Sequence, residues 1–312
     1  MRVRAAAITA AALIAGCGSG GGPPAAQTPA QPKAPPEPIQ VANGPIVIGP
    51  GPTPLAVKLK APDLIRVPFH RPPRAGLLFD LDTGRVLWRR NPTRILPIAS
   101  LTKMMTALLV VAGEPPGVRV RITKEARRAP GSRVGLLPKK KPVRLESLLY
   151  GLLLPSGNDA AHALAQKVSG NSRAFVTAMN DRAQKMNLGC THFTSVDGFV
   201  DAGNHSCAID LAALARAVLD QPRLARIVGA RSVVLRFPTK GGKLYLFNNN
   251  PLLRTGYAGT IGVKTGYTDA AGHCLVAAVR RGGHRLGVVL LHSPDTNVQA
   301  RKLLGRGFRA LG

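Results

Sequence analysis

The sequence predicts an α+β fold in which an antiparallel sheet is flanked by helices, with an all-helical insertion between the sheet's strands. Two observations lead to this prediction. Strand-like runs separated by turn residues occur at the start of residues 74–312 and again in the last third of the chain. Between these two groups lie five apolar segments with helical spacing, and one further segment of this kind ends the chain.

The first predicted elements are a hairpin and a helix. Residues 75–80 and 85–90 are strand-like and are joined through Asp82-Thr83-Gly84, which is a turn signal. In residues 99–112, apolar side chains recur at helical spacing and neither Gly nor Pro interrupts them, so this stretch predicts a buried helix. Pro97 lies just ahead of it, where its missing N–H group costs little.

The remaining elements follow in order. Residues 113–141 contain four prolines and are expected to be irregular, with short strand-like pieces such as 118–122. Further helices are predicted at 145–154, 160–168, 173–188, 208–219 and 296–304. Strands are predicted at 232–237, 243–247, 261–265, 273–280 and 285–292.

The N-terminus predicts export. Arg2 and Arg4 precede an apolar run, residues 5–15, that is too short to span a bilayer as a helix. The run ends in Leu-Ile-Ala-Gly-Cys17, which resembles a bacterial lipoprotein signal, so we expect residues 1–16 to be a signal peptide and Cys17 to be lipidated. The alternative is an ordinary secretory signal. Residues 17–73 hold 15 of the 27 prolines and are expected to be a flexible tether, with the folded domain at 74–312.

The net charge of +28 is strongly positive, and +24 of it lies after position 70. Nucleic acid is the usual partner of such a chain, but no helix-turn-helix, zinc-finger or RNA-binding aromatic motif is present, so none is expected here. An exported protein meets anionic lipids and wall polymers instead. A bias of composition toward Arg explains the charge equally well.

Ser100 and Lys103 are the first candidate catalytic residues. On a helix, side chains three residues apart share a face at a separation of about 5–6 Å. An amine in an apolar setting near a helix N-terminus has a lowered pKa. A neutral amine can take the hydroxyl proton, which makes Ser100 a candidate nucleophile and Lys103 its base.

Two further motifs follow at a distance in the sequence. Ser156-Gly-Asn158 lies in a polar turn that leads into a helix, where it would also serve as a cap. Lys264-Thr265-Gly266 lies on a strand, where a cation and a hydroxyl can meet a carboxylate and Gly266 lets a substrate backbone come close.

In this order and these contexts, the three motifs resemble those of the penicillin-recognising serine peptidases. Asp82-Thr-Gly, Thr191-His-Phe and Lys264-Thr-Gly-Tyr-Thr are similar to segments of the low-molecular-mass D-alanyl-D-alanine carboxypeptidases. The resemblance covers residues 75–312. It implies the β-lactamase/DD-peptidase fold and removal of the terminal D-Ala from peptidoglycan stem peptides, with β-lactams as covalent inhibitors and no metal or cofactor.

The resemblance also implies a role for each residue. Ser100 is acylated, Lys103 is the general base and Ser156 relays the proton to the leaving D-Ala. Asn158 holds Lys103 and the substrate amide, whereas Lys264 and Thr265 hold the terminal carboxylate. The remaining positions belong to the strand motif. Gly266 lets the substrate backbone come close to the strand, and the N–H group of Tyr267, with that of Ser100, forms the oxyanion hole. Some relatives have a second carboxylate-binding Arg about fifteen residues before the Lys-Thr-Gly motif. Here Asn249 stands there, and Arg254 is an unproven substitute.

The motifs leave other functions open. A DD-endopeptidase uses the same machinery on peptidoglycan cross-links, and a serine β-lactamase or a non-catalytic wall-binding relative is a further alternative. Class A β-lactamases deacylate with a Glu that follows the Ser-x-Asn motif. The four Glu residues of this chain, Glu37, Glu114, Glu125 and Glu146, all precede Ser156, so that route is closed.

Three of the four cysteines bear on these predictions. Cys190 and Cys207 form either a disulfide or a free thiol pair, or they bind a metal together with His192 and His205. The resemblance and the exported context favour the disulfide over the metal site. Cys274 lies in an apolar strand and is expected to be a buried thiol, and His162, in an alanine-rich helix, is expected to be packed or at the surface.

Overall fold

The computed structural model describes residues 55–200 and 202–312. The chain divides into two units, residues 1–42 and 43–312, and every described residue belongs to the second. The predicted signal peptide, the lipidation of Cys17 and the tether up to residue 54 therefore lie outside the described residues and stay predictions.

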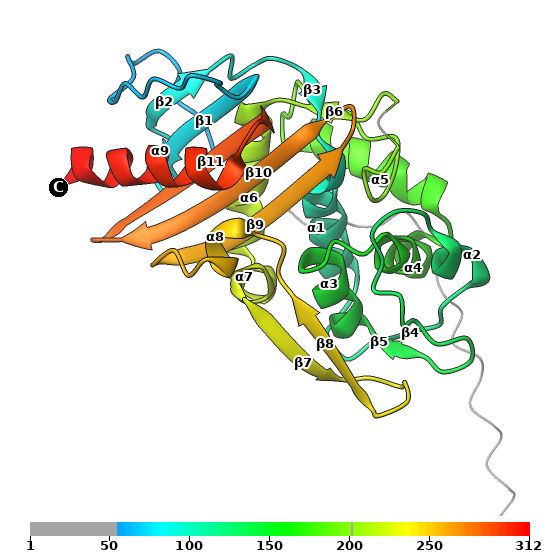
Figure 1. Ribbon diagram of the computed structural model, residues 1–312. Helices are drawn as coiled ribbons and strands as arrows, with labels where there is room; N and C mark the ends of the chain where they lie inside the picture. Colours follow the sequence, from blue (N-terminus) through cyan, green and yellow to red (C-terminus); the bar gives the residue numbers. More distant parts are fainter. Residues whose placement is uncertain (1–54, 201) are drawn as a thin grey trace, which may run out of the picture. The chain divides into compact units, whose positions relative to one another are not determined.

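A five-stranded antiparallel sheet organises this unit. Its order is β2-β1-β11-β10-β9, so strands from the two ends of the unit lie side by side (Figure 1). Ala75 pairs with Leu291 and Asp80 with Leu286, which places the first strand beside the last. The strands are β1 (Ala75–Asp80), β2 (Val86–Arg90), β9 (Thr260–Thr268), β10 (Gly272–Arg281) and β11 (His284–Ser293).

Helices cover both faces of the sheet, which agrees with the continuous burial of side chains along β1, β10 and β11. On one face lies α9 (Thr296–Leu311), which buries Leu303 and Leu304 against the sheet (Figure 1). The other face packs on α6 (Ala208–Asp220) and the larger apolar core, which also contains α1 (Lys103–Gly113). The predicted α+β architecture is confirmed. Among the described helices, none has the length and apolar character that crossing a membrane requires.

The helical insertion extends from α1 to α7. Its helices start at recognisable signals: Thr123 and Asn171 accept backbone N–H bonds at the starts of α2 and α5, and Pro222 occupies the first turn of α7. The bounds are α2 (Lys124–Arg128), α3 (Leu145–Leu153), α4 (Asn158–Ser169), α5 (Ser172–Lys185) and α7 (Pro222–Gly229), followed by a short α8 (Pro251–Arg254).

Several details differ from the sequence predictions. The strands β7 (Ser232–Arg236) and β8 (Lys243–Phe247) form their own hairpin outside the main sheet. The segment expected to be irregular contains α2, and α7 was not predicted. Two further small sheets pair β4 (Arg119–Val120), which lies within the strand-like piece predicted at 118–122, with β5 (Val143–Arg144), and β3 (Leu96–Pro97) with β6 (His205–Ser206).

The predicted domain start at residue 74 is too late. Residues 55–73 pack on the sheet: Ile65 and Val67 are buried, and the Ile65 N–H group donates to Leu87 O at 2.9 Å. The ring of Phe69 meets that of Trp88 edge-on at 6.0 Å. The high proline content misled the prediction, because a Pro-rich chain can still bury scattered apolar side chains against a finished sheet edge.

Candidate active site

The centre of the candidate site is the contact between Lys103 and Ser100. The Lys103 Nζ atom donates to Ser100 Oγ at 2.8 Å. Ser100 lies in a 3-10 turn, Ala99–Thr102, and Lys103 is the first residue of α1, so the two side chains meet across the junction. Ala99 enters this turn at φ 47°, a left-handed conformation that few residues other than Gly adopt.

Lys103 is completely buried, although it is a lysine. Its amine also donates to Asn158 Oδ1 and to the backbone carbonyl of Asp197, each at 2.7 Å. Burial lowers the pKa of Lys103 to about 8, and the carboxylates of Asp197 and Asp159 oppose this shift. The neutral amine is therefore accessible near physiological pH, as a general base requires.

Asp197 is a site residue that sequence reasoning missed. Its carbonyl binds Lys103, and its carboxylate Oδ2 lies 3.3 Å from His162 Nε2. Burial raises the pKa of Asp197, but the bond from His162, the charge of Lys103 and the Phe199 N–H group outweigh it, so the net pKa is lowered. Asp197 thus contacts both side chains, Lys103 through its carbonyl and His162 through its carboxylate. No local pattern indicated Asp197, because a turn residue 94 positions from Lys103 gives no periodic signal.

The Ser156-Gly-Asn158 turn brings α4 against this pair. Asn158 is buried, and its Nδ2 donates to Pro130 O at 2.6 Å while its Oδ1 accepts from Lys103. Ser156 has φ 68° and is also buried. Within the described part of the chain, its Oγ has no hydrogen-bond partner. A buried hydroxyl without a partner costs about 1–3 kcal/mol, which indicates a group that is completed by a ligand.

The third motif lies on β9, the edge strand next to the Ala99–Thr102 turn. Gly266 is so close to that turn that a Cβ atom on it would lie 2.9 Å from Ile98 O and 3.1 Å from Ser100 N. No larger residue fits without displacing the strand. Tyr267 follows with an exposed side chain, whose hydroxyl donates to Asp269 Oδ1 at 3.1 Å and whose ring lies 4.6 Å from that of His273.

Lys264 on the same strand is buried, and its Nζ donates to Thr265 O at 2.9 Å. Burial and then the charge of Lys103 hold the pKa of Lys264 well below its ordinary value. Among the described residues, no carboxylate pairs with it in a salt bridge. A bound anion would stabilise the charged form of Lys264 against both its burial and the repulsion from Lys103, so this position favours binding of an anion.

Asn249 and Arg254 were the two positions considered for a second carboxylate clamp. Asn249 lies beside the Ser156 turn: its N–H group donates to Leu154 O at 3.1 Å and its Nδ2 to Pro155 O at 3.2 Å. Arg254 is exposed on α8, and its carbonyl accepts a bond from Arg231. In residues 55–200 and 202–312, no hydrogen bond or salt bridge joins Arg254 to the Ser100 turn or to β9.

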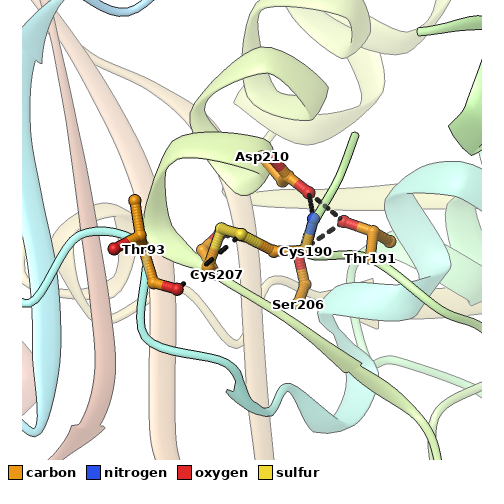
Figure 2. The surroundings of a disulfide bond; sticks show 6 residues. All are labelled: Thr93, Cys190, Thr191, Ser206, Cys207 and Asp210. Atoms are coloured by element: carbon orange, nitrogen blue, oxygen red, sulfur yellow. Dashed lines mark hydrogen bonds between the residues drawn. A yellow bond between two sulfur atoms is a disulfide. The ribbon is translucent and has the colours of Figure 1, made fainter. Parts of the chain in front are cut away.

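Cys190 and Cys207 form a disulfide in the structure (Figure 2). The pair was one of three alternatives, and the bond leaves neither sulfur as a thiolate ligand. Asp210 accepts bonds from Cys190 N and Thr191 Oγ1 beside it, and burial raises the pKa of this carboxyl more than those bonds lower it. Cys274 is buried on β10, as predicted, with its Sγ directed at Ala271 O.

Comparisons with known proteins bear on the family of this chain. A family model described as D-alanyl-D-alanine carboxypeptidase matches residues 71–295. The D-alanyl-D-alanine carboxypeptidase DacF of Bacillus subtilis is 33% identical over 243 residues, which is 75% of this chain and 62% of that protein. The chain thus spans less than two thirds of the length of this relative.

Two further comparisons bear on the type of reaction. A D-alanyl-D-alanine endopeptidase of Haemophilus influenzae is 32% identical, with 64% of this chain and 68% of that protein covered. The crystal structure of the Streptomyces K15 DD-transpeptidase superimposes with a TM-score of 0.72 at 31% identity, covering 78% of this chain and 100% of that one.

Proposed function

Because the chain belongs to the D-alanyl-D-alanine carboxypeptidase family, we propose that it is a serine hydrolase that removes the terminal D-Ala from peptidoglycan stem peptides. The observation that carries this proposal is the buried Lys103 amine, 2.8 Å from the Ser100 hydroxyl. Buried groups with perturbed pKa values cluster at functional sites, and this amine lies within hydrogen-bond distance of a serine hydroxyl that it can deprotonate.

The first step is acylation. The Ser100 oxygen attacks the carbonyl carbon of the penultimate D-Ala, and its proton passes to the neutral amine of Lys103. With a pKa of about 8, roughly a tenth of the amine is neutral at pH 7, against about 0.03% for an unperturbed lysine. The N–H groups of Ser100 and Tyr267 stabilise the oxyanion, which contributes about 2.7–4 kcal/mol per donor in a comparable enzyme.

Acylation is completed when the amide C–N bond of the tetrahedral intermediate breaks and D-Ala leaves, and the shortened peptide is released afterwards. The departing D-Ala nitrogen needs a proton, and Ser156 relays it from Lys103. The buried Ser156 hydroxyl, which is unpartnered within the described residues, supports this role. Asn158 keeps the Lys103 amine in place through their 2.7 Å bond. Water then hydrolyses the acyl-Ser100 ester and regenerates the hydroxyl.

The substrate's terminal carboxylate binds at β9. Lys264 supplies a buried positive charge for which the described residues provide no carboxylate, Thr265 supplies a hydroxyl, and Gly266 lets the peptide lie against the strand. A β-lactam carries a carboxylate and a strained amide in a similar arrangement, so it acylates Ser100 as a covalent inhibitor.

A DD-endopeptidase is the second candidate, favoured by the similarity to the Haemophilus influenzae enzyme. Both reactions pass through the same acyl-enzyme and differ in whether the leaving group is free D-Ala or a cross-linked stem. Peptidoglycan lies outside the cytoplasm, so either function places the domain there. The resemblance of residues 13–17 to a lipoprotein signal supports attachment to the membrane through a lipid on Cys17.

Mass spectrometry tests the proposal in two parts. Intact-mass analysis with a penicillin should show a single adduct in the wild type, and the adduct should be absent from Ser100→Ala and Lys103→Ala. Ser232→Ala, an exposed serine on β7, should label normally. Labelling that persists in Ser100→Ala would refute the assignment of the nucleophile. Product analysis then decides the reaction: release of D-Ala from a pentapeptide supports the carboxypeptidase, whereas cleavage of a cross-linked dimer supports the endopeptidase.

A further inference from the structure

In two places away from the candidate catalytic residues, two positively charged side chains lie directly opposite each other on paired strands. Arg119 pairs with Arg144 in the β4–β5 sheet, and Arg236 pairs with Lys243 in the β7–β8 hairpin. All four side chains are exposed. Like charges directly opposite each other destabilise a sheet. The repulsion within each pair would be relieved by an anion bound between the two side chains.

These two pairs line the same pocket. It has a volume of about 490 Å³, and its other lining residues are Pro142, Phe237, Pro238, Gly241 and Gly242. No acidic side chain is among the lining residues. Within the described residues, none of the four cations takes part in a salt bridge. The two sheets thus direct uncompensated positive charge at a common hollow.

The surrounding segments add more positive charge. Lys139, Lys140 and Lys141 immediately precede the pocket residue Pro142, and Lys240 lies in the hairpin turn beside Gly241; all four are exposed. The acidic residues nearest in sequence are already paired. Glu146 binds Arg223 and Arg226, and Glu114 binds Lys167. The local charge is therefore not neutralised by the protein itself.

We propose that this pocket binds a linear polyanion whose repeating charge is a phosphodiester. Arginine presents a planar fork of donors that matches phosphate oxygens, and three arginines line the pocket. Four lining cations and four more beside them exceed what a single phosphate needs, so a chain of anions fits the charge better. The hollow also favours a chain over a bilayer, because a flexible chain can follow the concave wall and contact the cations of both sheets at once.

The site is separate from the catalytic residues. None of the candidate catalytic or substrate-binding residues, Ser100, Lys103, Ser156, Asn158 or residues 264–267, lines this pocket. The proposal therefore does not depend on the proposed function. A bound polymer would hold the domain against a phosphate-rich matrix and leave the Ser100 site open.

Titration calorimetry on the purified full-length chain tests this inference. The probe is a synthetic glycerol phosphate oligomer, compared with inorganic phosphate, a polyglutamate of equal charge, and phosphatidylcholine vesicles containing phosphatidylglycerol. Vesicles are a necessary comparison because Val234, Tyr245 and Phe247 are exposed on the same hairpin. The variants are Arg236→Glu/Lys243→Glu and, from the other sheet, Arg119→Gln/Arg144→Gln. The control, Arg66→Glu/Arg306→Glu, changes two exposed charges elsewhere and gives the same net charge as the first variant.

The wild type should bind the oligomer more tightly than inorganic phosphate, with an affinity that falls as salt is added. Both pocket variants should bind roughly tenfold or more weakly, because each charged hydrogen bond is worth about that factor. The control should keep the wild-type affinity, and thermal unfolding should show all the variants folded. Equal weakening in control and pocket variants, the absence of binding, a preference for polyglutamate, or vesicle binding that the oligomer does not compete would each overturn the proposal.

Discussion

Replacing Gly266 by Ala is the sharpest test of the close contact between β9 and the Ala99–Thr102 turn. The added Cβ would lie 2.9 Å from Ile98 O, 3.1 Å from Ser100 N and 3.2 Å from the Ala99 Cβ. Relief to an ordinary contact requires a shift of about 0.3–0.5 Å, and packed interiors resist such shifts. The turn is held by the bond from Leu101 N to Ile98 O, and Gly266 is paired with Cys274 of β10.

The displacement would fall on the proposed oxyanion hole, because the methyl group stands next to the Ser100 N–H group. Losing one such donor lowers the rate by about 10²–10³-fold, or about 2.7–4 kcal/mol. We expect the second-order rate of acylation by a fluorescent penicillin to fall by about that factor, whereas overpacking lowers the free energy of unfolding by only about 1–3 kcal/mol. The measurement pairs stopped-flow acylation with urea unfolding.

Gly229→Ala is the matched control. Its Cβ would approach Ile261 O of the same strand at 3.4 Å, an ordinary contact, so both acylation and stability should stay near wild type. Acylation of Gly266→Ala at the wild-type rate would refute the close fit between β9 and the turn. An equal fall of the acylation rate in Gly229→Ala would show that acylation depends on any change beside β9 and not on the contact between Gly266 and the Ser100 turn.

Three other predictions follow from the same structure. The acylation rate should rise with pH through about 8 as Lys103 loses its proton. Asp197→Asn removes a negative charge that raises the pKa of Lys103, so the pH profile of this variant should move to lower pH by about one unit. The control Asp210→Asn should keep the wild-type profile, and a shift of the Asp197→Asn profile to higher pH would contradict the assignment of Lys103 as the base. The double variant Cys190→Ser/Cys207→Ser frees a loop with a sequence separation of 17 and should lose about 3 kcal/mol of unfolding free energy in urea, and an unchanged midpoint would oppose this. Cys17→Ala should abolish a lipid mass on the mature N-terminus and shift the protein from the membrane fraction, and wild type without that mass in the culture fluid would rule out lipidation.

The sequence predicted those features that local patterns encode. Helical spacing of apolar residues located α1, and strand-like apolar runs on either side of the Gly-Gly turn at 282–283 located β10 and β11, because each signal depends on neighbours a few residues away. The Ser-x-x-Lys spacing correctly placed Ser100 beside Lys103 for the same reason. Contacts between distant segments were not predictable in this way. Asp197, which holds Lys103 from a turn after α5, carries no periodicity that would identify it.

The predicted helix over residues 99–112 shows where local rules stop. The helical spacing is correct, but the chain enters at Ala99 with φ 47° and completes a 3-10 turn before α1 begins. The cause is tertiary. Gly198 packs so tightly on the Ala99 carbonyl that a Cβ there would lie 1.9 Å from its oxygen, and that oxygen also accepts the Thr102 hydroxyl. A spacing rule has no access to a glycine 99 positions away.

The same reasoning locates the function more specifically than the motifs do. Ala99 and Ser156 both adopt left-handed conformations that cost a residue with a Cβ about 1 kcal/mol or more, and Ser156 also buries a hydroxyl without a partner in the described structure. Lys103 and Lys264 add two amines that are buried against their preference for water. Each feature alone has a structural explanation. Residues 99–103, the Ser156 turn and β9 meet at one place, so these unfavourable features are concentrated around the Ser100 hydroxyl. Features of these kinds occur singly elsewhere, for example the left-handed Asn91 and His292. Their proximity here is explained by a substrate whose carboxylate and amide compensate the two amines and the Ser156 hydroxyl, which has no partner among the described residues.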